Sequence, residues 1–285
     1  MTKPVKFEDE RNRFHDALTA GILTLDDEGV ASNADKHSTS SVKLAKGIAD
    51  LLRAKNRSQK TGGQTSGTKF QDICKEFVER TFLGLKHLRP GEWEIKTKGI
   101  KLSEYAQYAH LADLAQLAEK NPKLAAALGN DYTINPDIVV ARKTVDDKAI
   151  NIKDNTLVND NVTKLASLRE QHNHNHPLLH ASISCKWTIR SDRAQNTRLE
   201  ALNLIRNRKG RLPHMVVVTA EPLPSRLESI ALGTGDIDCV YHFALYELQK
   251  TVISKRMKED AAKLNVMVDG NRLKDISDLP LDLAV

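Results

Sequence analysis

The chain has 285 residues, of which 40% are hydrophobic and 28% are charged, and its formal net charge is +6. This composition is typical of a globular protein and excludes a disordered or collagen-like chain. No apolar run approaches the roughly 20 residues that a membrane-spanning helix needs, and three widely separated cysteines indicate no disulfide framework. We therefore expect a cytoplasmic protein without membrane contact and with a mild preference for anionic partners.

The N-terminal third is expected to be helical. Apolar side chains have helical spacing over Glu8 to Leu23 and over Val42 to Lys55, with a polar loop at Ser32 to Ser41 between them. A glycine-rich loop from Ser58 to Gly67 is predicted to open into a further helix. One or two more helices, broken at an Asn-Pro pair, are predicted over Leu102 to Leu128.

The pattern changes to α/β after residue 129. Tyr132 to Ala141 is short and β-branched, which predicts a strand, and strict apolar–polar alternation predicts a longer strand from Leu178 to Arg190. We expect the polar face of the longer strand to look into a cleft or solvent. A helix at Ala194 to Arg208 and a buried strand at Arg211 to Thr219 follow, which favours a parallel crossover.

The remaining elements are a helix near Val162 to Glu170, a long helix from about Ile237 to Leu264 and an irregular tail. Together these elements predict an α/β fold. We interpret residues 1–285 as a single domain, with a helical part over about 1–128 and an α/β core over about 129–264.

Three charged residues of the α/β part form a candidate catalytic constellation. Asp137 follows a proline at the short strand, Lys186 lies on the polar face of the long strand, and Glu200 lies about two turns into the next helix. Hydrolysis of a phosphodiester needs a divalent metal held by hard oxygen ligands and a cation near the attacking water. We expect the three side chains to meet at one cleft. The alternative is a chance occurrence of common residue types.

A second cluster directly follows the long strand. Arg190 and Arg193 flank Asp192, and these residue types match a C·G step, because arginine donates to guanine O6 and N7 while aspartate accepts from cytosine N4. Basic residues outnumber acidic ones from Lys186 to Arg211. The alternative interpretation of that excess is a solvated helix face.

Two other motifs carry little weight. Histidines at 172, 174 and 176 have no cysteine or carboxylate at ligand spacing, which favours a surface loop over a zinc site. The run Gly63 to Gly67 lacks the Gly-Lys-Ser/Thr ending of a phosphate-binding loop.

In these residues the sequence resembles the NgoMIV type of restriction endonuclease, a type IIF group of the PD-(D/E)XK nucleases. The resemblance covers almost the whole chain. It rests on the motifs Pro136-Asp137, Ser184-Cys-Lys186, Arg190-Ser-Asp-Arg193 and Glu200.

The resemblance implies a restriction-endonuclease-like core, with a central mixed, partly parallel β-sheet flanked by helices. It also implies a Mg²⁺-dependent enzyme, with two ions per active site, that cuts double-stranded DNA at GCCGGC. Cutting after the first G leaves 5′ CCGG overhangs. The expected assembly is a homotetramer, a dimer of dimers, that works best on two sites. A cognate DNA methyltransferase and a bacterial cytoplasm are implied as the cellular setting.

The resemblance further implies the role of each active-site residue. Asp137 and the backbone carbonyl of Cys185 are expected to bind metal, and Lys186 to be the catalytic lysine. Ser184 occupies the position where most PD-(D/E)XK enzymes carry an acid, and Glu200 supplies that missing carboxylate.

DNA recognition is assigned in the same way. The inner CCGG sequence is expected to be read in the major groove, and further residues are expected to read the outer G·C pair. The inner readers are Arg190, Asp192 and Arg193, the outer readers are Asp35 and Arg226, and Gln64 acts from the minor groove.

One position departs from the family pattern, because Gln71 stands where the family has a glutamate. Three interpretations are open: the carboxylate is dispensable, Asp72 substitutes for it, or catalysis is weaker. Two rival functions are also open. One is a repair nuclease of the same fold that reads DNA structure, and the other is a non-cutting DNA-binding regulator.

Overall fold

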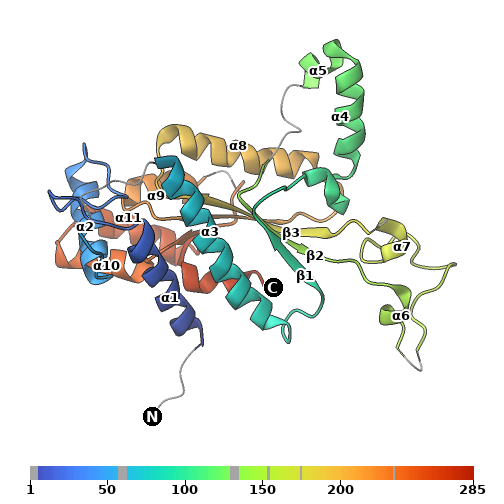
Figure 1. The fold of residues 1–285 in the computed structure, drawn as a ribbon, viewed down its shortest axis with the longest axis horizontal. Helices are drawn as coiled ribbons and strands as arrows, with labels where there is room; N and C mark the ends of the chain where they lie inside the picture. Colours follow the sequence, from blue (N-terminus) through green and yellow to red (C-terminus); the bar gives the residue numbers. More distant parts are fainter. Residues whose placement is uncertain (1–5, 57–62, 129–134, 153–154, 174, 234) are drawn as a thin grey trace. The chain divides into compact units, whose positions relative to one another are not determined.

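The computed structural model describes residues 6–56, 63–128, 135–152, 155–173, 175–233 and 235–285 (Figure 1). Contacts divide the chain into two units. The first unit comprises Met1–Arg89, Ile183–Leu199 and Met215–Val285, and the second comprises Pro90–Ser182 and Glu200–His214. Each unit is built from segments that are not consecutive in the sequence. The interpretation of residues 1–285 as one domain stays a prediction.

A six-stranded sheet with the order β1-β2-β3-β4-β5-β6 forms the centre of the fold. Strands β1 and β2 are antiparallel, with Ile95 opposite Val140. Strands β4, β5 and β6 are parallel, with Val217 opposite Val240. The predicted mixed, partly parallel sheet flanked by helices is therefore confirmed. The strands are β1 (Trp93–Lys96), β2 (Ile138–Arg142), β3 (Leu178–Lys186), β4 (His214–Thr219), β5 (Cys239–His242) and β6 (Leu273–Asp275).

Strand β3 follows the predicted alternation, and its apolar face is buried. The polar face changes along the strand: His180 is buried with its ring against those of Trp93 and His214, whereas Ser184 and Lys186 are half-buried. The strand ends at Lys186, four residues earlier than predicted. The neighbouring strand β4 ends at Thr219, so residues of β3 after Lys186 would have no β4 residues to pair with.

The described residues of the second unit also form the α-helices α4 (His110–Lys120), α5 (Pro122–Leu128), α6 (Asp147–Ile150) and α7 (Glu170–Asn173). The predicted break between α4 and α5 is confirmed, because the Asn121 side chain accepts the backbone N–H groups of Lys123 and Leu124. Such side-chain capping satisfies the first N–H groups of a helix and starts α5.

Helices α6 and α7 belong to the segment that connects β2 to β3 and that extends beyond the ends of these two strands (Figure 1). We call the described residues 147–152 and 155–169 the arm. Arg169, only 3% exposed, holds it together: its Nε donates to Asp147 at 2.8 Å, and its Nη1 donates to the carbonyls of Asn159 and Val162 at 3.2 and 3.1 Å. The helix predicted near Val162 to Glu170 was wrong, because Thr163 has a left-handed backbone (φ 54°) that interrupts helical hydrogen bonding.

Helices of the first unit pack in pairs: α1 contacts α3, α2 contacts α10, and α9 contacts α11. Gly47 permits the α2–α10 contact, since a Cβ at this position would lie 2.2 Å from Cγ2 of Thr251. Helix α8 runs from the first unit into the second. The bounds are α1 (Lys6–Gly21), α2 (Thr39–Leu51), α3 (Gly63–Phe82), α8 (Ser191–Asn207), α9 (Pro224–Ala231), α10 (Leu245–Ser254), α11 (Lys258–Asp269) and α12 (Leu279–Asp282).

Several predicted bounds were wrong. The long helix expected over Ile237 to Leu264 is instead β5, α10 and α11, because Arg256 takes a left-handed backbone (φ 53°) between the two helices. Gly63–Gly67, expected to be loop, begins α3; residues 57–62 lie outside the described part. Strand β2 begins at Ile138 rather than Tyr132, and residues 129–134 are likewise not described. None of the helices in the described residues has the length and apolarity to cross a membrane.

Candidate functional site

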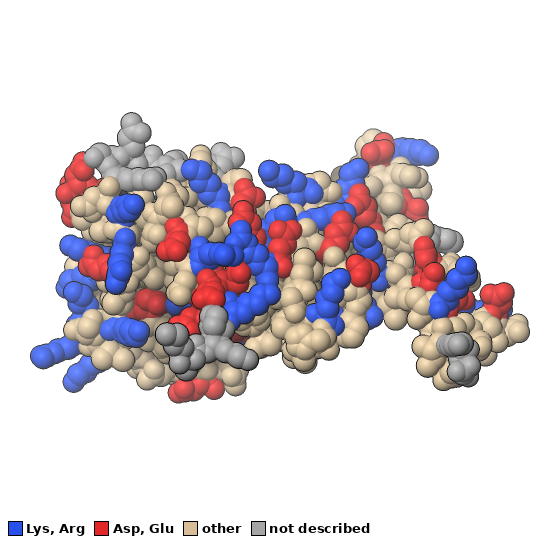
Figure 2. All heavy atoms as spheres, turned by 60° about the horizontal axis from the view of Figure 1, so that its bottom comes forward, with Lys and Arg blue, Asp and Glu red and all other residues tan. Residues whose placement is uncertain are grey.

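A pocket of about 660 Å³ in the first unit brings together arginines from α8 and α9. We call it the arginine pocket. Its size lies within the range of ligand-binding clefts. Its three guanidinium groups attract anions, although Arg198 also pairs with Asp236 at 3.1 Å and Arg226 pairs with Asp35. Figure 2 shows basic and acidic side chains intermixed on the face of the molecule that it draws, so charge alone does not locate an anion-binding surface there. The pocket is lined by Ile189, Arg190, Ala194, Gln195, Arg198, Ser225, Arg226 and Ser229.

Two residues predicted as separate DNA readers, Arg190 and Arg226, thus line one pocket. Arg190 immediately precedes α8, which begins at Ser191 rather than Ala194 as predicted, and the Arg190 carbonyl accepts the Ala194 N–H at 2.9 Å. The partial positive charge of a helix N-terminus adds to the attraction for anions. The backbone at Asp192 and Arg193 belongs to the first turn of α8, but their side chains lie outside the described residues.

The structure also pairs the two residues that the resemblance assigns to the outer G·C pair. Nη2 of Arg226 donates to Oδ2 of Asp35, although 191 positions separate them in the sequence. This hydrogen bond lowers the pKa of the Asp35 carboxyl below its usual value. Asp35 is further held by its backbone N–H, which donates to Oγ of Ser41 at 2.9 Å. Gln64, the third residue assigned to the outer G·C pair, is the second residue of α3. Its side chain lies outside the described part of the structure.

Sequence reasoning missed Glu221, which is fully buried beside these readers. Its carboxylate accepts the backbone N–H groups of Ile189 at 2.8 Å and Leu223 at 3.1 Å, and Oε2 lies 3.7 Å from Nη1 of Arg226. Burial raises the pKa of Glu221, while the two N–H donors and Arg226 oppose that rise. An acidic residue inside the apolar run Met215–Leu223 was the available signal.

The buried imidazole of His242 contacts the backbone of Glu221. Ala244 donates its N–H to Nδ1 of His242, and Nε2 contacts the Glu221 carbonyl at 3.1 Å, so the ring is neutral with its proton on Nε2. Burial lowers the pKa of His242 to about 4. Protonation at Nδ1 removes the acceptor that Ala244 uses.

We expect stability to fall with acidification through His242. Between pH 6.5 and 4 the unfolded chain binds a proton that the folded chain does not, so the free energy of unfolding decreases as pH falls, by about 1 kcal/mol between pH 7 and 5.5. Denaturant unfolding at both pH values measures this decrease. His242→Gln should have a shallower pH dependence than wild type, whereas His87→Gln, at an exposed position, should match wild type. An unchanged slope in His242→Gln contradicts the assignment.

The predicted catalytic residues of β3 are Ser184, Cys185 and Lys186, the last three of the strand. Ser184 and Lys186 are half-buried and Cys185 is buried. The Lys186 carbonyl accepts Oγ1 of Thr219 at 2.8 Å and the N–H of Ala220 at 3.3 Å. The backbone that carries the lysine side chain is thereby fixed at the strand end.

The two predicted carboxylates belong to the second unit. Asp137 is half-buried and directly precedes β2, after a buried Pro136. Glu200 is half-buried on α8. Their convergence with Lys186 stays a prediction.

A magnesium ion fits the chemistry of this donor set. Mg²⁺ prefers hard oxygen ligands and is usually held by one or two carboxylates together with waters and substrate phosphate, rather than by an all-protein cage. Asp137 and the Cys185 carbonyl are ligands of this kind. Among the described residues, no group of three His, Cys, Asp or Glu side chains could hold a metal ion. His176, from the histidine tract, contacts the Glu104 carbonyl instead.

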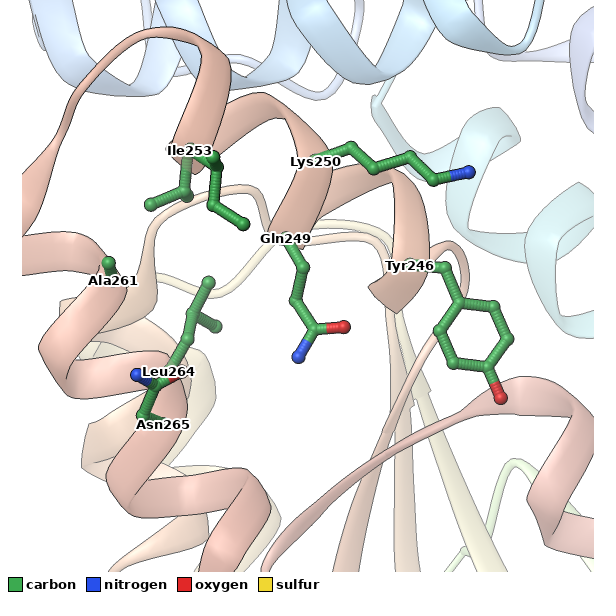
Figure 3. Close-up of a pocket in the computed structure, with 8 residues that line it drawn as sticks. Tyr246, Gln249, Lys250, Ile253, Ala261, Leu264 and Asn265 are labelled. Carbon is green, nitrogen blue, oxygen red and sulfur yellow. The ribbon is translucent and has the colours of Figure 1, made fainter.

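A second cavity, of about 580 Å³, lies between α10 and α11. Helix α10 contributes Tyr246, Gln249 and Lys250, and α11 contributes Leu264 and Asn265 (Figure 3). It includes none of the predicted site residues. The candidate functional site is therefore the arginine pocket and the residues at the end of β3.

Comparison with known proteins identifies the family of the chain. The family model of the NgoMIV restriction enzyme matches residues 14–285. The type II restriction enzyme NgoMIV of Neisseria gonorrhoeae is 58% identical over 284 residues, which cover 98% of this chain and 99% of that protein. The chain belongs to the NgoMIV restriction enzyme family. The resemblance inferred from its motifs is confirmed, and the sheet described above is the core of an NgoMIV-family restriction endonuclease fold.

Proposed function

We propose that this chain is a Mg²⁺-dependent type II restriction endonuclease that cuts double-stranded DNA at GCCGGC. Cleavage after the first G leaves 5′ CCGG overhangs with 3′-hydroxyl and 5′-phosphate ends. Family membership supports endonuclease activity. The observation that carries the proposal is the arginine pocket, where Arg190 and Arg226 line one cavity and Arg226 pairs with Asp35.

The catalytic roles follow from the side chains. The Lys186 ammonium favours deprotonation of the attacking water and stabilises the negative charge that develops on the phosphorus centre. Glu200 orients water from outside the first coordination sphere. Ser184, beside Lys186 on the polar face of β3, occupies the position of the acid that most relatives of the superfamily carry.

Asp137 and the carbonyl of Cys185 would hold the metal, with two ions per active site. When bound, Mg²⁺ supplies positive charge that offsets the charge of the phosphodiester and of its transition state.

Specificity comes from the residues around the arginine pocket. Arg190 and Arg193 donate to guanines of the inner CCGG sequence, and Asp192 accepts from cytosine amino groups. Asp35 and Arg226 read the outer G·C pair. Gln64, from the minor groove, completes the reading of that pair.

The proposal extends to assembly and cellular setting. We propose a homotetramer, a dimer of dimers, in the bacterial cytoplasm, with a cognate methyltransferase protecting the host genome. The arm supports self-association, because it exposes large apolar side chains that a partner can cover. These are Ile152, Leu157, Val162 and Leu165.

A plasmid digest with Mg²⁺, followed by sequencing of the fragment ends, tests the proposal. We expect every end to map to GCCGGC with a 5′ CCGG overhang, and faster cutting of a plasmid with two sites than of one with a single site. Controls are EDTA in place of Mg²⁺ and the same plasmid with its sites removed. Ends that map to DNA structures rather than a sequence favour the repair nuclease, and specific binding without cleavage favours the regulator.

Gln71 provides a test of the departure from the family pattern. We expect Gln71→Glu to retain or raise the cleavage rate, because an added carboxylate restores the family's negative charge near the proposed metal site. Single-turnover cleavage of a duplex with one site measures the rate. Asp72→Asn is the companion variant, and its rate should fall only if Asp72 substitutes for the family glutamate. A strong loss in Gln71→Glu contradicts the expectation and indicates a site rebuilt around the amide.

A further inference from the structure

We propose that Glu221 is a positioning residue that couples the reading of the outer G·C pair to the reading of the inner CCGG sequence. The inference rests on the proposed function, because it takes Arg226 and Arg190 as groups that contact bases. Glu221 is 0% exposed, so it acts through the groups that it holds.

The first of these groups is the backbone beside Arg190. Oε2 of Glu221 accepts the N–H of Ile189 at 2.8 Å, and Ile189 is itself buried. A charge-assisted hydrogen bond away from water is stronger than an exposed one. It fixes the peptide from which Arg190 and the first turn of α8 depart.

The second group is the guanidinium of Arg226. Nη1 lies 3.7 Å from the same oxygen, Oε2 of Glu221, while Nη2 donates to Asp35. A planar guanidinium between two carboxylates has one favoured orientation. The other oxygen of Glu221 accepts the N–H of Leu223, which immediately precedes α9, so the helix that carries Arg226 is anchored too.

One buried carboxylate therefore serves both sets of readers. An amide is a poor replacement, because the NH₂ of a glutamine can accept no hydrogen bond from Ile189 or Leu223 and offers Arg226 no negative charge. Loss of the Glu221 charge is expected to weaken discrimination at the inner and outer positions together. Asp35, in contrast, holds Arg226 and accepts the backbone N–H of His37 in its own turn, so its loss should affect the outer pair alone.

Binding measurements in EDTA, where no cleavage occurs, test the coupling. Dissociation constants are compared for a GCCGGC duplex, a duplex altered in the outer pair and a duplex altered in the inner four pairs. We expect both discrimination ratios to fall about fivefold in Glu221→Gln. Glu228→Gln is the matched control and should keep both ratios. Glu228 lies on α9, the helix that carries Arg226, with its carboxylate 3.7 Å from Nζ of Lys263. A lower melting temperature with both ratios unchanged indicates a merely structural residue and overturns the inference.

Hydrogen exchange on the DNA-free protein provides a second measurement. Glu221→Gln should speed exchange in peptides that cover residues 187–195 and 222–230, and leave peptides of α1 unchanged. Unaltered exchange there overturns the inference. If Glu221→Gln does not fold, Glu221→Asp, which keeps the charge but shortens its reach, should show the same changes to a smaller extent. A wild-type chain without discrimination refutes the proposed function and this inference with it, whereas a discriminating wild type and an equally discriminating Glu221→Gln refute only the inference.

Discussion

Lys186→Ala is expected to lower the cleavage rate at GCCGGC by about three orders of magnitude or more, with the affinity for the same duplex nearly unchanged. The ammonium acts mainly on charge that develops in the transition state, so its removal affects the chemical step more than binding. The contacts that fix the strand end use the Lys186 carbonyl, which alanine retains. Single-turnover cleavage with Mg²⁺ and equilibrium binding in EDTA measure the two effects separately.

The matched control for this experiment is Lys255→Ala, an exposed lysine that immediately follows α10. It removes the same charge from the chain and should cleave at the wild-type rate. Equal losses of binding and cleavage in Lys186→Ala indicate that this lysine has a structural role. In that case the active-site assignment built around β3 is wrong.

Asp192→Asn is expected to weaken affinity for GCCGGC at least tenfold, which corresponds to about 1.4 kcal/mol, while non-specific binding barely changes. A carboxylate accepts hydrogen bonds from cytosine amino groups, and an amide of the same shape replaces one acceptor with a donor. The resulting unpaired groups cost free energy only in the specific complex. Competition binding with duplexes altered in the inner four base pairs measures the loss.

An alternative role for Asp192 is a salt bridge that only fixes its neighbouring arginines. Full retention of discrimination against inner-site alterations by Asp192→Asn rules out direct readout. The control variant is Asp269→Asn, an exposed aspartate at the end of α11, which should bind as wild type does. The salt dependence of non-specific binding should be the same in all three proteins, since phosphate contacts determine it.

Elements with a strong local signal could be predicted from the sequence. The apolar–polar alternation of β3 and the helical spacing of α8 were sufficient to predict both elements, although His180 and Ser182 on the polar face of β3 are buried as well. Boundaries set by tertiary contacts could not be predicted. The separation of β5, α10 and α11 depends on a left-handed residue at Arg256, and the short strands β1 and β6 carry too few residues for a clear period.

For the candidate site, the sequence was sufficient to choose residues but not to predict how they are arranged. Residue types and family motifs were sufficient to select Arg190, Arg226 and Asp35 from the sequence. Their arrangement required the structure, because the pairing of Asp35 with Arg226 spans 191 positions. Glu221 escaped sequence analysis because its importance comes from which N–H groups surround a buried carboxylate, and no local pattern encodes that surrounding.

The internal bracing of the arm by Arg169 has a consequence for assembly. A segment already held by an ion pair and two carbonyl contacts loses little conformational entropy when another subunit covers it. Ordering a flexible residue costs about 1–2 kcal/mol in backbone freedom alone, so a pre-shaped arm spares self-association much of that cost. In the proposed homotetramer, the described residues of the arm should therefore keep this conformation, and their exposed apolar side chains can contribute their burial directly to the stability of the assembly.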